Sequence, residues 1–338
     1  MKSKYFKIGN KYVGEGKKVF IIAEIGVNHE GNFEKCVNLF KKAKFSGADA
    51  VKLQTVNPDY SYAKGTKSYN EFKDTDFSDQ QYSKLKKIAN KLNLVFFSTP
   101  GSLLEVDRII KIGAQAIKIS SGLSTNLPLI KYASEKKLPL IISTGMAYKN
   151  EIKEALNSTG SNKRVAILKC TSLYPAPDDS LNISSINELK SLFNTVVGFS
   201  DHTLDDLSCI SAVAAGAKII EKHFTLNKNK FGKDHKISLE PREFKIMVDK
   251  IRRVEKMLGS QKVKPNHKEI KFRKAFHRCL VAGKTILKNE RFNPDNVMLK
   301  RAKSSQLGLG PKFYENFIGK INKKKILKDQ LLKIKNLK

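Results

Sequence analysis

The sequence predicts a (β/α)8 barrel, because eight short apolar runs alternate with amphipathic stretches between residue 19 and about residue 259. The apolar runs are nearly continuous, which is typical of parallel strands buried on both faces and joined by crossover helices. Eight such units fit a closed barrel of about 250 residues. A doubly wound open sheet is the alternative, but no G-x-G-x-x-G follows the first predicted strand.

The predicted strands are rich in Val, Ile and Leu, and the helical stretches between them carry their apolar residues on one face. A stretch such as 105–113 also ends on Gly113, a residue type that favours the end of a helix. The strands are 19–25, 50–54, 94–98, 116–120, 140–144, 165–170, 195–200 and 218–223, and the clearest helices are 33–47, 105–113, 127–137 and 205–216.

The segments before and after the repeats differ from them in composition and in hydrophobic pattern. The stretch "YFKIGNKYVGEGKKVF" predicts an N-terminal hairpin that turns at Gly9 and Asn10 on the barrel floor. Polar residues 261–275 lack periodicity and are interpreted as a linker. The pieces "HRCLVAGKTI", "VMLKRA" and "FIGKIN" then predict a small β-rich domain. The expected division is therefore 1–260 for the barrel, 261–275 for the linker and 276–338 for the C-terminal domain.

Composition excludes several classes of protein. In 338 residues, 40% are hydrophobic and 28% charged, and no window approaches the ~18 apolar residues of a membrane span. The first residues lack the apolar core of a signal peptide, so we expect a cytoplasmic protein. The four cysteines are scattered, as expected of reduced thiols. The net charge of +32 is spread along the chain without interleaved aromatic residues, so we expect no nucleic-acid partner.

Polar side chains end nearly every predicted strand. The carboxyl ends of barrel strands meet at one face, where such enzymes place their chemistry. One polar residue of this kind could cap a helix, but eight strands that end alike predict a site. These residues are Glu24, Lys52, Gln54, Ser98, Thr99, Lys118, Ser120, Ser121, Ser143, Thr144, Lys169, Thr171, Ser172, Ser200, Asp201, His202, Glu221 and His223.

Two kinds of binding chemistry follow from these residues. Lys52 and Lys118 lie inside strands, where an unpaired ammonium is costly, so with nearby hydroxyls they predict an anion site. His202 and His223 end neighbouring strands, close enough to share a divalent cation beside Glu24. Imidazole and oxygen ligands together suit Mn²⁺, with Mg²⁺ or Co²⁺ as substitutes.

Two further segments carry candidate residues. His29 and Glu30, in the first loop, either contact a substrate or only turn the chain. His235 lies in a loop after the last strand that is long enough to cover the barrel mouth, and Asp234 beside it is a candidate polar contact.

Taken together, these motifs resemble the sialic acid synthase family, whose members make N-acetylneuraminate and the related legionaminic and pseudaminic acids. The C-terminal part resembles that family's antifreeze-like SAF domain. The resemblance extends from about residue 5 to residue 325. It is carried by "FIIAEIGVNHEGN", "VKLQT", "FFSTP", "IKISSG", "STGM", "CTSLYPAP", "GFSDHT" and "IIEKHFTL…GKDHKISLEP".

The resemblance implies a domain-swapped homodimer that condenses phosphoenolpyruvate with an open-chain N-acylated amino sugar such as N-acetylmannosamine. His202 and His223 would hold the divalent metal, and Arg301 would reach into the partner's pocket. Glu24 is the candidate for proton transfer at the attacking water. Phosphoenolpyruvate would be bound by Lys52, Lys118, Ser121, Ser143, Ser172 and Ser200 with Glu221 nearby, and the sugar side would be faced by Glu24, Gln54, Thr99, Tyr174 and Asp234.

Two motifs depart from the family pattern. Ser121-Gly122-Leu123 stands where the family commonly has Ser-Gly-Glu, which implies a different or less hydroxylated acceptor. Arg301 is followed by Ala-Lys-Ser-Ser, where the family commonly has Pro-Gly-x-Gly. The acceptor sugar, the physiological metal and the role of Arg301 are therefore left open by the sequence.

Other function classes remain as alternatives. Another metal-dependent barrel aldolase or sugar-acid synthase would share the strand-end residues. Schiff-base chemistry fits less well, because it needs a lysine in an apolar pocket and these lysines accompany hydroxyls. A nucleic-acid or ice-binding protein built on an inactive barrel predicts a loss of pocket residues, but both lysines, both histidines and Glu24 are present.

Overall fold

The computed structural model describes residues 4–260, 262–301 and 308–338, and the chain divides into two compact units, Met1–Gly259 and Ser260–Lys338. The first unit is a closed barrel of eight parallel strands, which confirms the predicted fold class. Its strands follow chain order around the barrel. They are β3 (Phe20–Gly26), β4 (Ala50–Thr55), β5 (Val95–Pro100), β6 (Ile117–Ile119), β7 (Leu140–Ser143), β8 (Val165–Cys170), β9 (Val196–Asp201) and β10 (Ile219–His223).

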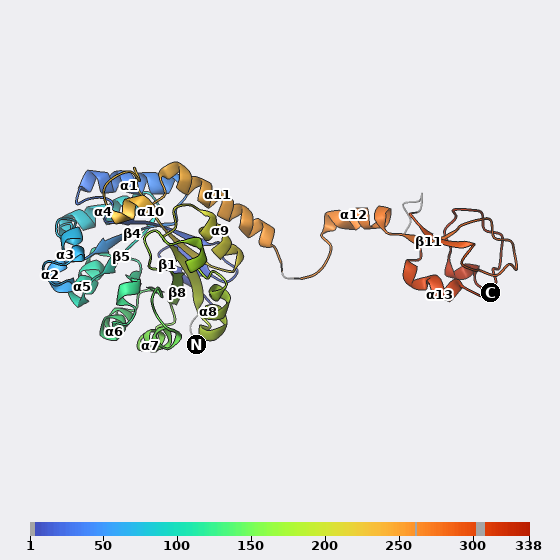
Figure 1. Ribbon diagram of the computed structural model, residues 1–338, viewed down its shortest axis with the longest axis horizontal. Helices are drawn as coiled ribbons and strands as arrows, with labels where there is room; N and C mark the ends of the chain where they lie inside the picture. Colours follow the sequence, from blue (N-terminus) through green and yellow to red (C-terminus); the bar gives the residue numbers. More distant parts are fainter. Residues whose placement is uncertain (1–3, 261, 302–307) are drawn as a thin grey trace. The chain divides into compact units, whose positions relative to one another are not determined.

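Helices form a ring around these strands (Figure 1). Local sequence sets several of their ends: Asn32 caps the first helix, Ser78 and Gln81 form a capping box, and Gly113 ends a helix in the left-handed conformation. The helices are α1 (Phe33–Phe45), α2 (Pro58–Ser61), α3 (Lys67–Phe72), α4 (Asp79–Lys91), α5 (Leu103–Ile112), α6 (Leu127–Glu135), α7 (Lys149–Ser158), α8 (Ser185–Phe193), α9 (Leu207–Ala214), α10 (Lys233–Ile237) and α11 (Pro241–Leu258), with 3-10 turns η1 (Ser121–Leu123) and η2 (Asp178–Ser180).

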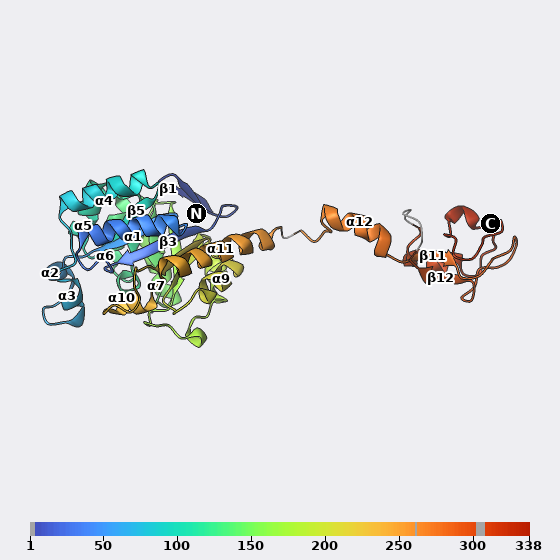
Figure 2. The ribbon, with the colours of Figure 1, turned by 90° about the horizontal axis from the view of Figure 1, so that it is seen from above.

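The predicted N-terminal hairpin is present as β1 (Tyr5–Ile8) and β2 (Lys11–Gly14). Its turn at Gly9 approaches the side chains of Gln115 and Val95, which stand at the amino ends of β6 and β5. Figure 2 shows the hairpin on the side of the barrel away from α2, α3 and α10. The hairpin therefore lies at the barrel floor and leaves the carboxyl ends of the strands accessible.

The second unit has its own small core, built around Leu280, Ile286, Phe292, Phe317 and Leu332. Its regular elements are short, and isolated β-bridges such as Ile286 with Ile326 and Arg291 with Ile321 join further loops of the unit. The elements are α12 (His267–Phe276), β11 (Cys279–Ala282), β12 (Val297–Lys300), η3 (Pro311–Phe313), α13 (Tyr314–Phe317) and η4 (Ile334–Asn336).

The stretch 261–275, interpreted from the sequence as a linker without periodicity, is helical in its second half, because α12 begins at His267. The side chain of Asn266 accepts hydrogen bonds from the backbone N–H groups of Lys268 and Glu269. The Glu269 carboxylate in turn accepts the N–H of Asn266. This reciprocal cap stabilises a short polar helix without an apolar stripe, which explains why periodicity did not indicate it.

Gly198 in β9 has no room for a side chain. A methyl group there would lie 2.6 Å from the Ile219 side chain, the Ile219 carbonyl oxygen and the Leu168 side chain. We expect Gly198→Ala to lower the free energy of unfolding by about 1–3 kcal/mol, because the neighbouring backbone cannot yield freely. Urea unfolding would measure this. Gly122→Ala is the control, since among the described residues no atom beyond its chain neighbours lies within 4 Å of a methyl group at that position; equal stability of the two variants would contradict the prediction.

Candidate active site

The barrel brings the predicted site residues together at the carboxyl ends of its strands. Strand register explains the grouping: Glu24 pairs with both Lys52 and His223, and Ser200 pairs with Glu221. The residues at strand ends or in the following loops are Glu24, Lys52, Gln54, Thr99, Lys118, Ser121, Ser143, Ser172, Tyr174, Ser200, His202, Glu221, His223 and Asp234. Arg301 lies in the second unit, directly after β12.

Lys52 is buried at the centre of this group and is held by carboxylates. Its ammonium lies 2.9 Å from Glu24 Oε1 and 3.8 Å from Glu221 Oε2, and it donates a 3.0 Å hydrogen bond to the Thr99 hydroxyl. Burial by itself lowers the pKa of Lys52, but the charges of Glu221 and Glu24 outweigh burial and raise it. Lys52 therefore presents a fixed positive charge to the pocket.

Lys118 carries the second buried ammonium group and lies on β6, separated from the strand of Lys52 by β5. It donates a 2.6 Å hydrogen bond to the Ser143 hydroxyl and lies 3.6 Å from Glu221 Oε1. Burial lowers the pKa of Lys118, with Glu221 opposing the shift. The same two ammonium groups overcome the effect of burial at Glu221 and lower its pKa, and the Ser200 hydroxyl donates to it at 3.0 Å.

Hydroxyl groups lie at the strand ends beside the ammonium pair. The Ser121 hydroxyl accepts the Gly145 N–H at 3.1 Å, and a side chain at Gly145 would collide with the hydroxyls of both Ser121 and Ser172. Within the described part of the chain, the buried Ser172 hydroxyl has no hydrogen-bond partner. A phosphate or carboxylate placed here would receive charge-assisted hydrogen bonds that the protein itself leaves unmade.

Glu24 is almost completely buried. Burial is the main cause that raises its pKa, opposed by Lys52 and reinforced by Glu221. Gln54 donates to its Oε1 at 3.0 Å, while Oε2 has no hydrogen-bond partner in the described structure. Gly26 beside it has a positive φ of 53°, and a side chain there would crowd Asp234, Gln54 and Glu24. A glycine at this position therefore keeps clear the carboxylate oxygen that Lys52 and Gln54 hold.

His202 and His223 face one another, with their ring centroids 5.4 Å apart. His202 Nδ1 lies 2.8 Å from the Thr171 carbonyl oxygen, which fixes that nitrogen as the donor and leaves Nε2 as a free acceptor. Burial and the neighbouring His202 hold the pKa of His223 well below its ordinary value, so its ring is neutral. Tyr174 stacks on His202 at 4.1 Å and, exposed on its outer side, closes this side of the pair.

This pair fits a divalent cation. Imidazoles are good ligands for such ions in their neutral form, and a carbonyl that orients one ring is a common feature of metal sites. Burial lowers the pKa of His202, but the Cys170 thiol and the Thr171 carbonyl outweigh burial and raise it, so a cation bound at Nε2 would replace a proton there. His223 Nδ1 lacks a hydrogen-bond partner in the described residues and lies 3.7 Å from Asp234 Oδ2. Among the residues that the structure describes, no group of three or more His, Cys, Asp or Glu side chains is preformed for a metal. The other ligand positions would fall to water or substrate oxygens.

The loop residues that the sequence left open have structural roles. The His29 ring is fully buried, stacks on Phe77 at a centroid distance of 4.5 Å, and accepts the Gly31 N–H at 3.1 Å. Glu30 lies 2.9 Å from the Lys35 ammonium and 3.0 Å from His235 Nε2. His235 therefore ties α10, which carries Asp234, to the first loop. The segment that was expected as an open loop is in part this short helix.

Sequence reasoning missed two features near the histidines. The Cys170 thiol lies 3.9 Å from His202 Nδ1, although it was interpreted only as a buried thiol. Lys222 forms a fully buried ion pair with Asp201 between the two strands that carry the histidines. The in-strand position of Lys222 carried the same signal that singled out Lys52 and Lys118.

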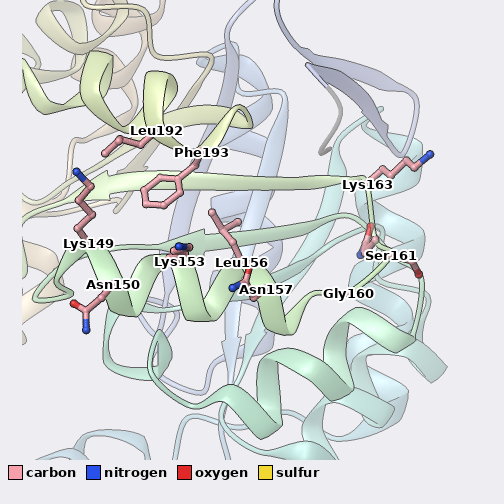
Figure 3. A pocket seen from close by; sticks show the side chains of 11 residues that line it. Lys149, Asn150, Lys153, Leu156, Asn157, Gly160, Ser161, Lys163, Leu192 and Phe193 are labelled. Atoms are coloured by element: carbon pink, nitrogen blue, oxygen red, sulfur yellow. The ribbon is translucent and has the colours of Figure 1, made fainter.

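A groove elsewhere on the barrel lacks comparable chemistry. It lies beside α7, and Figure 3 shows Lys149, Lys153 and Leu156 of that helix on the side of Leu192 and Phe193, with Asn150 pointing away. Its lining contains no carboxylate and no imidazole. The lining residues are Lys149, Asn150, Lys153, Leu156, Asn157, Gly160, Ser161, Asn162, Lys163, Leu192 and Phe193.

The fold, with charged side chains gathered at the carboxyl ends of its strands, is that of a barrel enzyme. Comparison with known proteins makes the assignment specific. Residues 39–263 match the NeuB family. The chain is 38% identical to N,N'-diacetyllegionaminic acid synthase of Campylobacter jejuni, covering 94% of this chain and 99% of that one. It is 36% identical to pseudaminic acid synthase of the same species, covering 93% and 94%.

A solved structure agrees with these relatives. N-acetylneuraminic acid synthetase from Leptospira borgpetersenii, in complex with citrate, matches with a TM-score of 0.77 at 33% identity, covering 81% of this chain and 98% of that chain. The chain therefore belongs to the NeuB family of sialic acid synthases and is an enzyme of that family. In the part of the chain that the structure describes, no helix is long and apolar enough to cross a membrane.

Burial of His29 makes folding stability depend on pH. Burial, with the charge of Lys35, lowers its pKa from 6.5 to about 4. As the pH falls, His29 is protonated in the unfolded chain before it is protonated in the folded one. Its contribution to the free energy of unfolding is therefore fully present above pH 6.5 and decreases as the pH falls toward 4. At ~1.4 kcal/mol for each pH unit, the contribution is about 3 kcal/mol. Urea unfolding at pH 7 and pH 4 should show a larger loss for the wild type than for His29→Gln; equal losses would contradict the prediction.

Proposed function

We propose that the protein condenses phosphoenolpyruvate with an open-chain N-acylated amino sugar, similar to N-acetylmannosamine, to give a nine-carbon sialic-type acid and phosphate. The observation that supports this proposal most directly is the grouping of Lys52 and Lys118 with Glu24 and Glu221, beside the paired rings of His202 and His223. The ammonium groups and hydroxyls suit a doubly anionic donor, and the imidazole side suits a polarised aldehyde.

Donor binding falls to the ammonium side of the pocket. Lys52 and Lys118 receive the negative charges of phosphoenolpyruvate, and the hydroxyls of Ser121, Ser143, Ser172 and Ser200 orient its oxygens. Both lysines are buried, so their charges act in a region of low dielectric constant, where they stabilise developing charge more strongly than in water. Glu221 keeps the two ammonium groups in place between strands.

Carbon–carbon bond formation follows from that arrangement. C3 of phosphoenolpyruvate attacks the aldehyde carbon, the aldehyde oxygen takes up a proton, and C2 becomes an oxocarbenium centre. Water then adds to C2, and phosphate departs with cleavage of the C2–O bond to leave the ketone. A divalent ion held by His202 and His223, Mn²⁺ with Mg²⁺ or Co²⁺ as substitutes, would supply Lewis-acid polarisation of the aldehyde.

Glu24 is placed to take the proton from the attacking water. Its Oε2 is unengaged in the described structure, and burial raises its pKa toward the range of a working base. Gln54 fixes the other oxygen, so the carboxylate cannot rotate freely. Asp234 and Tyr174 flank the histidine side of the mouth, where the sugar would lie.

The acceptor is expected to carry few hydroxyl groups near η1. Leu123 is half-buried and packs against the barrel core at the position where a glutamate is common in the family. An apolar side chain there favours a deoxy carbon or an acyl methyl over a hydroxyl. The names of the relatives, which include legionaminic and pseudaminic acid synthases, agree with such an acceptor. Another sugar-acid synthase or metal-dependent aldolase that uses a different aldehyde is the alternative.

A domain-swapped homodimer is part of the proposal, with the second unit as the antifreeze-like SAF domain. Exposed apolar side chains surround the barrel mouth, namely Met146, Tyr148, Leu173, Leu204 and Phe231. Such a rim favours coverage by protein. In the second unit, the exposed Arg301 lies over the Phe276 ring at 4.6 Å, available to a partner's pocket. The departure from the family loop falls on residues 302–305, outside the described residues.

The defining experiment measures phosphate release from phosphoenolpyruvate by folded, Mn²⁺-loaded protein with a panel of acylated hexosamines. We expect release that depends on both metal and sugar, with the fastest turnover for acceptors that lack hydroxyls where N-acetylmannosamine has them. Phosphate release with none of the sugars would contradict the proposed function. Release only with simple, non-acylated aldehydes would favour the alternative.

Replacing Glu24 with Gln should lower kcat by about 100-fold or more, because the water loses its base while the shape of the pocket is kept. Mn²⁺ content, measured by elemental analysis, should stay at the wild-type level. Glu255→Gln is the control, since that half-buried carboxylate accepts the Val19 N–H on the barrel floor. Unchanged turnover of Glu24→Gln would remove Glu24 from the mechanism.

A further inference from the structure

A fully buried ion pair joins the two strands that carry the histidines. Lys222 Nζ lies 2.5 Å from Asp201 Oδ2, and neither side chain is exposed to solvent. Asp201 and Lys222 are register partners in β9 and β10, each one residue before a histidine. The Cys209 thiol of α9 lies 3.5 Å from Asp201 Oδ2. The pair therefore occupies the outer side of the sheet, under α9, behind the pocket.

The lysine holds the chain on both sides of His202. Besides Asp201, its ammonium donates a 2.6 Å hydrogen bond to the Thr203 carbonyl oxygen. The Asp201 carboxylate closes the same loop, because it accepts both the backbone N–H and the hydroxyl of Thr203 at 3.0 Å. One side chain from the strand of His223 thus fixes the residues immediately before and after His202.

Stability alone does not explain a charged pair at this place. A buried ion pair loses the hydration of both charges, and a well-packed apolar pair of similar volume often stabilises a fold equally well or better. An ion pair adds direction, since its hydrogen bonds are satisfied in one register and one backbone conformation only. Here that conformation sets the separation and the facing of the two imidazole rings.

We propose that the Asp201–Lys222 pair is a positioning device that sets His202 and His223 at the spacing needed to bind a divalent cation. The inference rests on the proposed function, in which these histidines hold the ion. Ligand side chains must converge within a fraction of an ångström for tight binding, so a shift of either strand end weakens the site. Asp201 and Lys222 act through the histidines and do not contact the reactants.

The test compares Mn²⁺ affinity with folding in Asp201→Leu, Lys222→Met and the double variant that carries both changes. Either single change leaves one buried charge unpaired and is expected to impair folding. The double variant replaces the pair with apolar side chains of similar size, so we expect cooperative unfolding at a midpoint close to that of the wild type. Its metal-free form should bind Mn²⁺ at least about tenfold more weakly by titration calorimetry.

Arg252→Met provides the matched control. Arg252 also joins distant segments, through Asp49 at 3.1 Å and the Val19 carbonyl oxygen at 2.8 Å, but at the barrel floor. This variant should bind Mn²⁺ with wild-type affinity even where its stability is lower. A folded Asp201→Leu/Lys222→Met protein with wild-type Mn²⁺ affinity would overturn the positioning role alone. A wild-type protein that takes up no Mn²⁺ would overturn the metal site of the proposed function, and the inference with it.

Discussion

Burial of two ammonium groups in the barrel mouth is the constraint on which the site depends. Lys52 and Lys118 cannot be withdrawn from water without counter-charges, and Glu24 on β3 and Glu221 on β10 supply them, Glu221 from across the barrel mouth to Lys118. Each carboxylate thereby becomes fixed as well, and its own proton affinity changes in response. The four side chains therefore influence one another, and the pKa of each is shifted from its ordinary value.

The closed barrel makes this set possible, because parallel register brings residues from distant parts of the sequence to the same level. Glu24 and His223 are paired through β3 and β10, the first and last strands of the barrel. The same register aligns Asp201 with Lys222 and thereby the two histidines that follow. Catalytic geometry is therefore inherited from hydrogen-bonded strand pairing, which is among the stiffest parts of the fold.

Much of this was accessible from the sequence. Eight apolar runs predicted the barrel and its strand order, and the barrel fold is confirmed. Polar residues at strand ends indicated which side chains would meet, since parallel strands end at one face. Contacts made by loops, such as Ser121 with Gly145, could not be predicted, because turns have no periodicity. The Asp201–Lys222 pair was not predicted, because these side chains lie on the outer face of their strands, away from the residues that were grouped as a site. Helix α12 was not predicted, because a reciprocal cap stabilises it in place of an apolar stripe.

The division of labour between strands and loops has an evolutionary consequence. Lys52, Lys118 and Glu221 belong to barrel strands. Leu123, Tyr174 and Asp234 belong to the segments that connect strands to the following helices. Loops accept substitutions and insertions far more readily than the strands of a barrel do. Under the proposed function, such an arrangement would let a lineage change its acceptor through a few loop substitutions, while the charged side chains on the strands are retained.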